Sequence, residues 1–456
     1  MTATACGSHL SHREIVAAQS GGGSGGLSSG AKGASAAGDL SGITGQAGTA
    51  GDTGANTAAL GDTGTGPGGE GPVGGGPSAA GASADACGGA PCAPIIIGSV
   101  GSYSGITGQT VGTGVKGLQA WVASINAKGG LGGHEVQLVV GDDGGDPAKD
   151  RALVQEFVEE KGVVAFVYNA ASLAGQASVD YLTEKRIPVL GADGSESWFL
   201  DSPMFFPQTT AGDRLWDVAA GGAQWKLNEL GITKVGVISC SDGIQVCEDG
   251  RRVLPQAAPK FGQQVVYNGQ GSLAQPDYTA NCLAAQSAGA QFIYVVLDGN
   301  SLQRLARSCA NANYRPLYSV GQQIQLDTVA QDPNLQGSIG TTVVASPYGS
   351  GNPAVDEFRA AMAQYSPDTS LSGSPVLGWS SGKMLEAAAQ RLSNPPTSDD
   401  ILNGLWSLNG NDLNGLVLPL QFTKDQNASP PACWWEIIIN DKAYQSANDG
   451  QRHCAP

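Results

Sequence analysis

A serine between glycines is the first pattern in this sequence that could support catalysis. Residues 378–382, GWSSG, have the G-x-S-x-G spacing of a nucleophile elbow. The elbow needs a strand before it, a helix after it, and a His and an acid to activate the serine. Ser374-Pro375 makes the preceding segment a poor central strand, and His453 is the only downstream histidine. The same spacing at 22–26 lies in low-complexity sequence, so a secreted serine hydrolase is a minor alternative and we expect no enzyme.

Metal and cofactor chemistry have little support. The acidic run 142–146 lacks the spacing and the terminal Glu of a calcium-binding EF-hand, so we expect a solvated turn there. There is no C-x-x-C pair, and the globular part has only His134 and His453 as imidazole ligands. No phosphate-binding G-x-x-x-x-G-K-[ST] motif occurs. We therefore expect no metal and no cofactor.

Nine cysteines indicate the compartment. Cys6 follows small residues and precedes Gly7, which is similar to the end of a bacterial lipobox, and we expect it to be lipidated. No positively charged and apolar signal region precedes it, so the start is either trimmed or misassigned.

The other eight cysteines are an even number, which suits four disulfides in an oxidising compartment. Eight cysteines allow 105 pairings, so the connectivity stays open. We therefore expect an extracytoplasmic protein, at the cell surface or in the periplasm. Proximity in sequence suggests the pairs Cys87–Cys92, Cys240–Cys247, Cys282–Cys309 and Cys433–Cys454.

Composition divides the chain near residue 92. Residues 21–90 hold 25 glycines, and none of the 28 aromatic residues precedes Tyr103. Such a segment buries too little apolar surface to offset its conformational entropy, so we expect 1–92 to be a flexible stalk. With 24 Lys and Arg against 40 Asp and Glu, the net charge is −16. That excess of acid argues against nucleic acid and against docking on anionic lipid.

Short apolar runs alternate with helical patterns in the rest of the chain. Helical spacing relates Val115, Leu118, Val122 and Ile125, and similar faces occur at 152–158 and 302–306. Strands of this kind, followed by amphipathic helices, indicate parallel sheets covered on both faces. We therefore expect an α/β fold of two doubly wound lobes. The expected strands are 94–100, 135–140, 163–168, 187–191, 234–239, 264–267, 291–296, 316–320 and 341–345.

Three segments carry a resemblance to a known family. They are 101–105 (GSYSG), 125–133 (INAKGGLGG) and 142–147 (DDGGDP). Together they resemble the leucine/isoleucine/valine-binding branch of the type I periplasmic binding proteins, over about 94–456. The resemblance implies a solute-binding protein of an ABC importer, with two lobes joined by a three-crossover hinge.

The resemblance also implies where the lobes begin and end. The first lobe would comprise 93–211 and 346–420, and the second 212–345 and 421–456. The chain would cross between them near Gly212, Ser346 and Gln421.

Ligand-binding positions follow from the same resemblance. Ser172 and Ser195 fall where the family binds the head group of an amino acid. Either Ile244 or Gln245 aligns with a pocket Tyr, and Asp298 aligns with another pocket aromatic. Gly321 or Gln322 occupies the place of a Glu that binds ammonium, and Trp379 is either a cleft wall or core filler. The candidate ligand-binding residues are Tyr103, Ser104, Ala171, Ser172, Asp193, Ser195, Gln245, Asp298, Gln322 and Trp379.

Two departures shape the expected ligand. The ammonium-binding Glu is missing, although Asp298 could replace it. Asp193 lies in the loop that should receive a carboxylate, where it would repel one unless it caps a turn and points away. We expect a small polar ligand, either an amino acid, an amide or a related compound.

The expected partners follow from these inferences. They are the small-molecule ligand and an ABC permease in the membrane, with no nucleic acid, membrane contact only through lipidated Cys6, and a monomeric chain. The main alternative is a surface-displayed receptor or scaffold that uses the same fold without transport.

Overall fold

The computed structural model describes residues 87, 91–192, 194 and 197–455. Residues of the expected stalk before 87, including Cys6, lie outside the described residues, as do Asp193 and Ser195. Within the described part, no helix is both long and apolar enough to cross a membrane.

The first lobe is built on a parallel sheet with the strand order β2-β1-β3-β4-β5. Its central strands are buried because helices cover both faces, which explains their continuous apolar runs. The strands are β1 (Ile95–Gly101), β2 (Val136–Asp142), β3 (Ala165–Val167), β4 (Val189–Leu190) and β5 (Phe205–Phe206). The helices are α2 (Gly105–Ala127), α3 (Pro147–Glu159), η1 (Gly175–Ser178), α4 (Val179–Lys185) and η2 (Ser197–Leu200).

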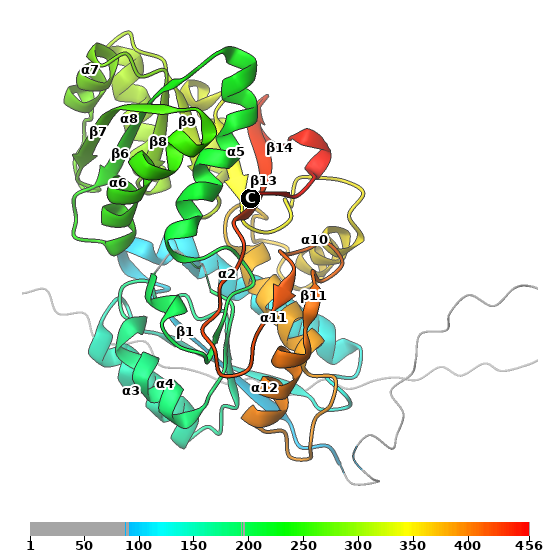
Figure 1. Ribbon diagram of the computed structural model, residues 1–456. Helices are drawn as coiled ribbons and strands as arrows, with labels where there is room; N and C mark the ends of the chain where they lie inside the picture. Colours follow the sequence, from blue (N-terminus) through cyan, green and yellow to red (C-terminus); the bar gives the residue numbers. More distant parts are fainter. Residues whose placement is uncertain (1–86, 88–90, 193, 195–196, 456) are drawn as a thin grey trace, which may run out of the picture. The chain divides into compact units, whose positions relative to one another are not determined.

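Three helices from much later in the chain complete this lobe. They are α10 (Pro353–Tyr365), α11 (Pro375–Ala388) and α12 (Ser398–Ser407). In Figure 1 the orange helices α11 and α12 lie in the same half as β1, α3 and α4. Both α10 and α11 pack against α2, so residues far apart in sequence share one core.

The contact between α2 and α11 depends on glycine. A Cβ atom added at Gly117 would lie 1.8 Å from the Pro375 carbonyl oxygen, and one added at Gly378 would lie 1.8 Å from the Gly114 carbonyl oxygen. Each partner atom belongs to the backbone, which cannot rotate away as a side chain would. The two helices therefore approach more closely than any other residue would allow.

We predict that Gly117→Ala destabilises the protein by about 2 kcal/mol or more, because the added methyl group overpacks the interface. Alanine favours a helix over glycine by about 1 kcal/mol, so helix propensity alone would make the variant more stable. Urea unfolding of the full chain measures the change. Gln119→Ala, at an exposed position of the same helix, is the control and should stay within about 0.5 kcal/mol of the parent. A stabilised Gly117→Ala variant would contradict the close approach.

The second lobe has a mixed sheet with the strand order β14-β13-β10-β9-β8-β6-β7. Strands β10, β9, β8, β6 and β7 are parallel, and β13 is antiparallel to β10, β14 and β15. Its strands are β6 (Lys234–Cys240), β7 (Gln264–Gly271), β8 (Phe292–Val296), β9 (Leu317–Gly321), β10 (Ile339–Thr342), β13 (Cys433–Asn440), β14 (Ala443–Ser446) and β15 (His453–Cys454). Its helices are η3 (Gly212–Arg214), α5 (Leu215–Leu230), α6 (Gln245–Ala257), η4 (Ala258–Phe261), α7 (Thr279–Ser287), α8 (Gly299–Asn311), η5 (Gln322–Ile324), α9 (Asp327–Gln331), η6 (Pro333–Leu335) and η7 (Asn448–Gly450).

The chain passes between the two sheets three times. The connections run from β5 to α5, from β10 to α10, and from β12 (Leu420–Gln421) to β13. Strand β12 pairs with β11 (Asn409–Asn411). This is the expected α/β fold with three crossovers. The lobe boundaries at 211/212, 345/346 and 420/421 stay proposals.

One expected strand, 341–345, is displaced in the structure. Strand β10 spans Ile339–Thr342, and Val343, Val344 and Ala345 instead pack into the first-lobe core. Their apolar pattern thus belongs to a crossover segment, which the backbone bond from Ala345 N–H to the Leu416 carbonyl oxygen fixes in the first lobe. The antiparallel strand β13 was not among the strands expected from sequence.

The eight cysteines form four disulfides, and the pairs are those suggested by proximity in sequence. Cys282–Cys309 joins α7 to α8, and Cys433–Cys454 joins β13 to β15. Such bonds stabilise a fold chiefly by restricting the unfolded chain, and they persist in oxidising compartments.

Candidate functional site

A pocket of about 200 Å³ lies at the carboxyl ends of the second-lobe strands. Its walls come from β8, the segment after β9, β10, the turn between β6 and α6, and the start of α5. Val111 of α2 and Ser172 reach it from the first lobe. Ligands of parallel α/β sheets bind at this edge, because the strand-to-helix turns diverge there. The pocket is therefore built by both lobes.

Apolar side chains form most of the wall. Trp216 is 6% exposed and packs on Gly250 of α6, where an added Cβ would lie 2.7 Å from the indole ring. Tyr294 of β8 also lines the pocket. Its hydroxyl donates to Gln263, a residue outside the pocket lining. Further apolar lining residues are Leu215, Val218, Ala219, Ile244, Val246, Leu254, Leu273, Val295, Val296, Leu297, Ile324 and Val343.

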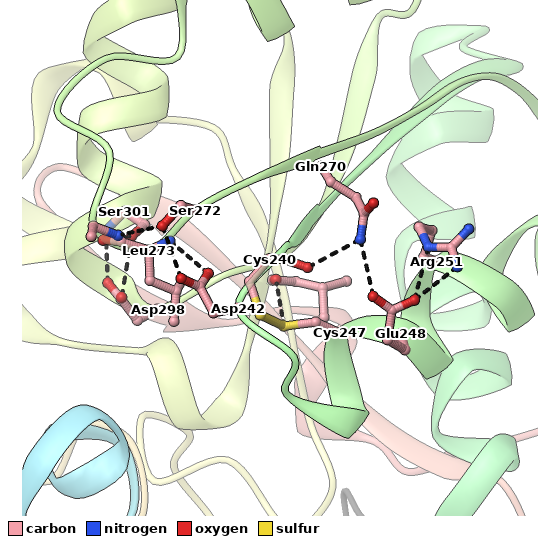
Figure 2. The surroundings of a disulfide bond; sticks show 12 residues. Cys240, Asp242, Cys247, Glu248, Arg251, Gln270, Ser272, Leu273, Asp298 and Ser301 are labelled. Atoms are coloured by element: carbon pink, nitrogen blue, oxygen red, sulfur yellow. Dashed lines mark hydrogen bonds and ion pairs between the residues drawn. A yellow bond between two sulfur atoms is a disulfide. The ribbon is translucent and has the colours of Figure 1, made fainter. Parts of the chain in front are cut away.

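Two aspartates hold the loops at the rim in place (Figure 2). Asp298 lines the pocket and caps α8, accepting bonds from the Ser301 N–H at 2.7 Å and from the Ser301 hydroxyl at 3.1 Å. Asp242 accepts from the Ser272 hydroxyl and the Leu273 N–H, both at 2.8 Å. Both carboxylates thus already serve the protein's own donors.

A disulfide fixes the turn between β6 and α6 (Figure 2). Cys240 ends β6, and Cys247 lies in the first turns of α6 and lines the pocket. Gln270 of β7 donates both to the Cys240 carbonyl oxygen and to Glu248, which also pairs with Arg251 at 2.8 Å. The turn carries Ile244 and Val246 into the wall, so the disulfide and this network shape the pocket.

Gln322 is a buried polar residue of the pocket wall. Its Oε1 atom accepts a bond from the Val343 N–H at 2.8 Å, which assigns the other end of the amide as the Nε2 donor. The residue is 4% exposed, and Nε2 has no hydrogen-bond partner among the described residues. An unsatisfied buried donor costs about 1–3 kcal/mol.

The structure brings three of the predicted residues together. Ser172, Asp298 and Gln322 line the pocket. Gln245 is exposed and donates to Asp249, so the other candidate at that place, Ile244, is the one in the wall.

The first-lobe loop residues serve the fold instead. The Tyr103 hydroxyl donates to the Tyr168 carbonyl oxygen at 2.8 Å, Ser104 is exposed at the start of α2, and Ala171 is buried. Trp379 is 1% exposed and packs on Phe358 in the first-lobe core, which fits the core-filler alternative of the two given from sequence.

The serine pattern of a hydrolase has another explanation. Residues 378–382 lie inside α11, whose first residue is Pro375, so no strand and no tight turn presents the serine. Ser380 is fully buried, and its hydroxyl donates to the Leu377 carbonyl oxygen at 3.0 Å. The small residues of this string instead allow α11 to approach its neighbours.

Sequence reasoning missed the residues that give the pocket its apolar character. Trp216, Val218 and Ala219 follow the expected crossover at Gly212, and Tyr294 lies within an expected strand. The position of Trp216, Val218 and Ala219 within one helical segment was the only sign of them in the sequence. Without the packing of α5 on the sheet, that face is indistinguishable from any core-facing helix.

A buried pair of carboxyl groups lies beneath the first-lobe loops. Asp143 is 1% exposed and accepts from Ser102 at 2.7 Å, and Asp150 is fully buried and accepts from Ser178. Burial raises the pKa of Asp150 to about 6, with Ser178 opposing the shift and Asp143 adding to it. The acidic run was expected to be a solvated turn, which is wrong for Asp143, whereas Asp146 is exposed and caps α3.

Asp150→Asn should remove a pH dependence of stability. Because the native pKa is about 6 against an ordinary 3.8, the native state binds more protons, and its stability falls as pH rises from about 4 through 6. At 1.36 kcal/mol per unit, the loss reaches at most about 3 kcal/mol at pH 7.5. Urea unfolding at pH 4.5 and 7.5 should show a smaller decrease for Asp150→Asn than for the parent. Asp180→Asn, at an exposed acid of α4, is the control; equal slopes for all three proteins would contradict the assignment.

Comparison with known proteins agrees with this architecture. The fold and the interlobe pocket define a two-lobed solute-binding protein of type I. The family described as periplasmic binding protein matches residues 94–442, so this chain belongs to that family. The family implies an extracytoplasmic location.

Individual relatives are more distant. The Leu/Ile/Val-binding protein homolog 2 of Brucella abortus (strain 2308) is 35% identical over 82 residues, which cover 16% of this chain and 22% of that relative. The chain therefore matches only about a fifth of that relative's length.

Two solved structures share the fold over most of the chain. The branched-chain amino acid transporter substrate-binding protein LivJ of Streptococcus pneumoniae, in complex with isoleucine, has a TM-score of 0.64 at 16% identity, covering 79% of this chain and 99% of that one. A fatty acid ABC transporter substrate-binding protein of Thermomonospora curvata has a TM-score of 0.63 at 18% identity, covering 79% and 91%. At these identities the likeness shows the fold alone. Both relatives are described as substrate-binding proteins and not as enzymes.

Proposed function

We propose that this chain is the extracytoplasmic solute-binding component of an ABC importer. It captures a small molecule in the interlobe pocket and delivers it to a membrane permease. The observation that carries the proposal is the pocket itself, which Val111 and Ser172 complete from the first lobe. A site shared by two lobes favours their closed arrangement when it is filled, because only that arrangement makes both sets of contacts.

Contacts between the lobes support this mechanism. Asp327, at the start of α9, accepts bonds from the hydroxyls of Ser370 and Ser372 at 2.9 and 2.5 Å. These serines lie between α10 and α11 of the first lobe. The contact flanks η5 (Gln322–Ile324), so the pocket wall and the interlobe contact belong to one segment.

The remaining parts of the proposal concern anchoring. Lipidation of Cys6 would tether the chain to the membrane, and the Gly-rich residues up to 92 would act as a stalk for a monomeric binding domain. Four disulfides suit the oxidising side of that membrane.

Ala219→Phe should abolish binding, because the larger side chain fills a pocket of about 200 Å³. A thermal-shift screen of the full chain against leucine, isoleucine, valine, and small aromatic ketones, amides and acids measures it. A ligand present at 100 times its Kd adds about 2.7 kcal/mol, which raises Tm by several degrees. The matched control is Ala284→Phe, on an exposed position of α7, which should keep the ligand-induced shift. An undiminished shift in Ala219→Phe would place the ligand elsewhere.

Transport is tested in the source cell. Deletion of the gene should abolish ATP-dependent uptake of the solute that binds, and the parent sequence should restore it where Ala219→Phe does not. Normal uptake without the protein, despite binding, would favour the receptor role.

A further inference from the structure

The Cys87–Cys92 disulfide lies against a buried histidine. The Nε2 atom of His134 is 3.7 Å from the Cys87 sulfur, and the histidine is 2% exposed. Both cysteines are only half-buried. In the part of the chain that the structure describes, no other histidine lies within 4.8 Å of both sulfurs of a disulfide. This disulfide therefore differs from the other three in having an imidazole nitrogen at one of its sulfurs.

A hydrogen bond fixes which nitrogen of His134 faces the sulfur. The Nδ1 atom is 2.6 Å from the Ala93 carbonyl oxygen. A carbonyl oxygen only accepts, so Nδ1 carries a proton and donates it. In the neutral ring Nε2 is then the acceptor, whereas in the imidazolium Nε2 is a second donor. The ring therefore presents to Cys87 the nitrogen that gains or loses the proton.

The backbone around His134 is held on both sides. The N–H groups of His134 and Leu131 each donate to the other residue's carbonyl oxygen at 2.9 Å. A Cβ atom added at Gly130 would lie 2.1 Å from the His134 carbonyl oxygen. The turn that ends the motif at 125–133 thus closes directly on the histidine. Its imidazole is placed by the fold and not by the disulfide alone.

The residues next to Cys92 are held as well. The Asn394 side chain accepts from the Ala93 N–H at 2.9 Å and donates to the Pro91 carbonyl oxygen at 3.4 Å. Cys92 lies between these two anchored residues. Its position is therefore fixed by contacts that do not require the bond to Cys87.

A metal site is the other chemistry that two cysteines and a histidine support. The three ligand atoms lie within 4.8 Å of one another. Metal ions bind cysteine as the thiolate, however, and here the two sulfurs are bonded to each other. The arrangement therefore favours chemistry of the disulfide itself.

We propose that Cys87–Cys92 is an exchangeable disulfide that reacts with a small thiol or dithiol, with Cys92 as the residue modified and His134 stabilising the thiolate that leaves from Cys87. The site lies where the Gly-rich segment meets β1. The inference is independent of the solute pocket and goes beyond solute binding.

The exchange is a single displacement at sulfur. The incoming thiol loses its proton to solvent, and its thiolate attacks the Cys92 sulfur. A new S–S bond forms between the thiol and Cys92 as the Cys87–Cys92 bond breaks. The electron pair of the broken bond leaves with Cys87 as a thiolate. The imidazolium of His134 stabilises that thiolate by donating from Nε2.

The product depends on the reagent. A monothiol stops at a mixed disulfide with Cys92. A dithiol continues, because its second thiolate attacks the mixed disulfide and releases Cys92 as a thiolate. The dithiol is then oxidised by two electrons to a cyclic disulfide, and the protein disulfide is reduced by the same two electrons.

The test uses reduced glutathione as the thiol. The full chain is incubated with it at pH 7.5, the reaction is stopped with N-ethylmaleimide, and tandem mass spectrometry identifies the adduct on each cysteine. We expect Cys87–Cys92 to open at least tenfold faster than Cys282–Cys309, whose two residues are fully buried. We also expect glutathione on Cys92 and maleimide on Cys87 at least fivefold more often than the reverse, because the better stabilised thiolate leaves.

His134→Asn separates the chemistry from the packing. The shorter amide can still donate to the Ala93 carbonyl oxygen, but nothing replaces Nε2. We expect exchange at Cys87–Cys92 to be at least fivefold slower and the preference for Cys92 to be lost, with Tm within a few degrees of the parent. His453→Asn is the matched control, because His453 precedes Cys454 of another disulfide. It should change neither the rate nor the preference.

The outcomes that would overturn the inference are distinct. Exchange in His134→Asn as fast as in the parent would remove the role of the imidazole. Equal labelling of Cys87 and Cys92 by glutathione in the parent would also overturn it, and that result needs no variant to fold. Equal slowing in His134→Asn and His453→Asn would do the same, since the effect would then not belong to the nitrogen beside Cys87.

Discussion

The hydrogen bond from Val343 N–H to Gln322 Oε1 joins the pocket wall to the crossover segment that enters the first lobe. It joins η5 at the end of β9 to the segment that leaves β10, and it turns the amide so that Nε2 is the end left without a partner. The position of this wall therefore depends on a backbone donor contributed by the crossover itself.

The same crossover connects the pocket to the first lobe. Val343 lines the pocket, while Val344 and Ala345 are buried in the first-lobe core. The Gln322 side chain is thus hydrogen-bonded to a residue adjacent to that core. Ser172 and Val111 line the pocket from the first lobe's own elements. Binding and lobe closure share one short stretch of chain, which gives a physical route for the population shift that solute delivery requires.

Sequence patterns revealed the fold better than they revealed the site. Parallel strands such as β6 and β8 are buried on both faces, so they read as apolar runs, and disulfides between nearby cysteines followed from proximity. Trp379 and Ser380 could not be placed from spacing alone. Both are buried side chains of α11, which packs against helices from distant parts of the chain. Asp143 shows the same limit, since its acidic neighbours indicated a solvated turn and tertiary packing buried it.

The pocket required information that no local pattern holds. Gln322 was a candidate from the resemblance, but the orientation of its amide depends on a bond to a residue 21 positions later. The apolar wall depends on how α5 lies over β8 and β10. Loops that follow parallel strands are polar in most sequences, so their composition predicted a polar ligand, whereas the faces beneath them are apolar.

The most direct measurement is mass spectrometry of the small molecule that co-purifies with the full chain. The intact complex is weighed under non-denaturing conditions, and the ligand is then extracted with organic solvent and identified. We predict one small molecule per chain that is absent from Ala219→Phe prepared in parallel. A molecule that co-purifies equally with the parent and with Ala219→Phe would contradict it.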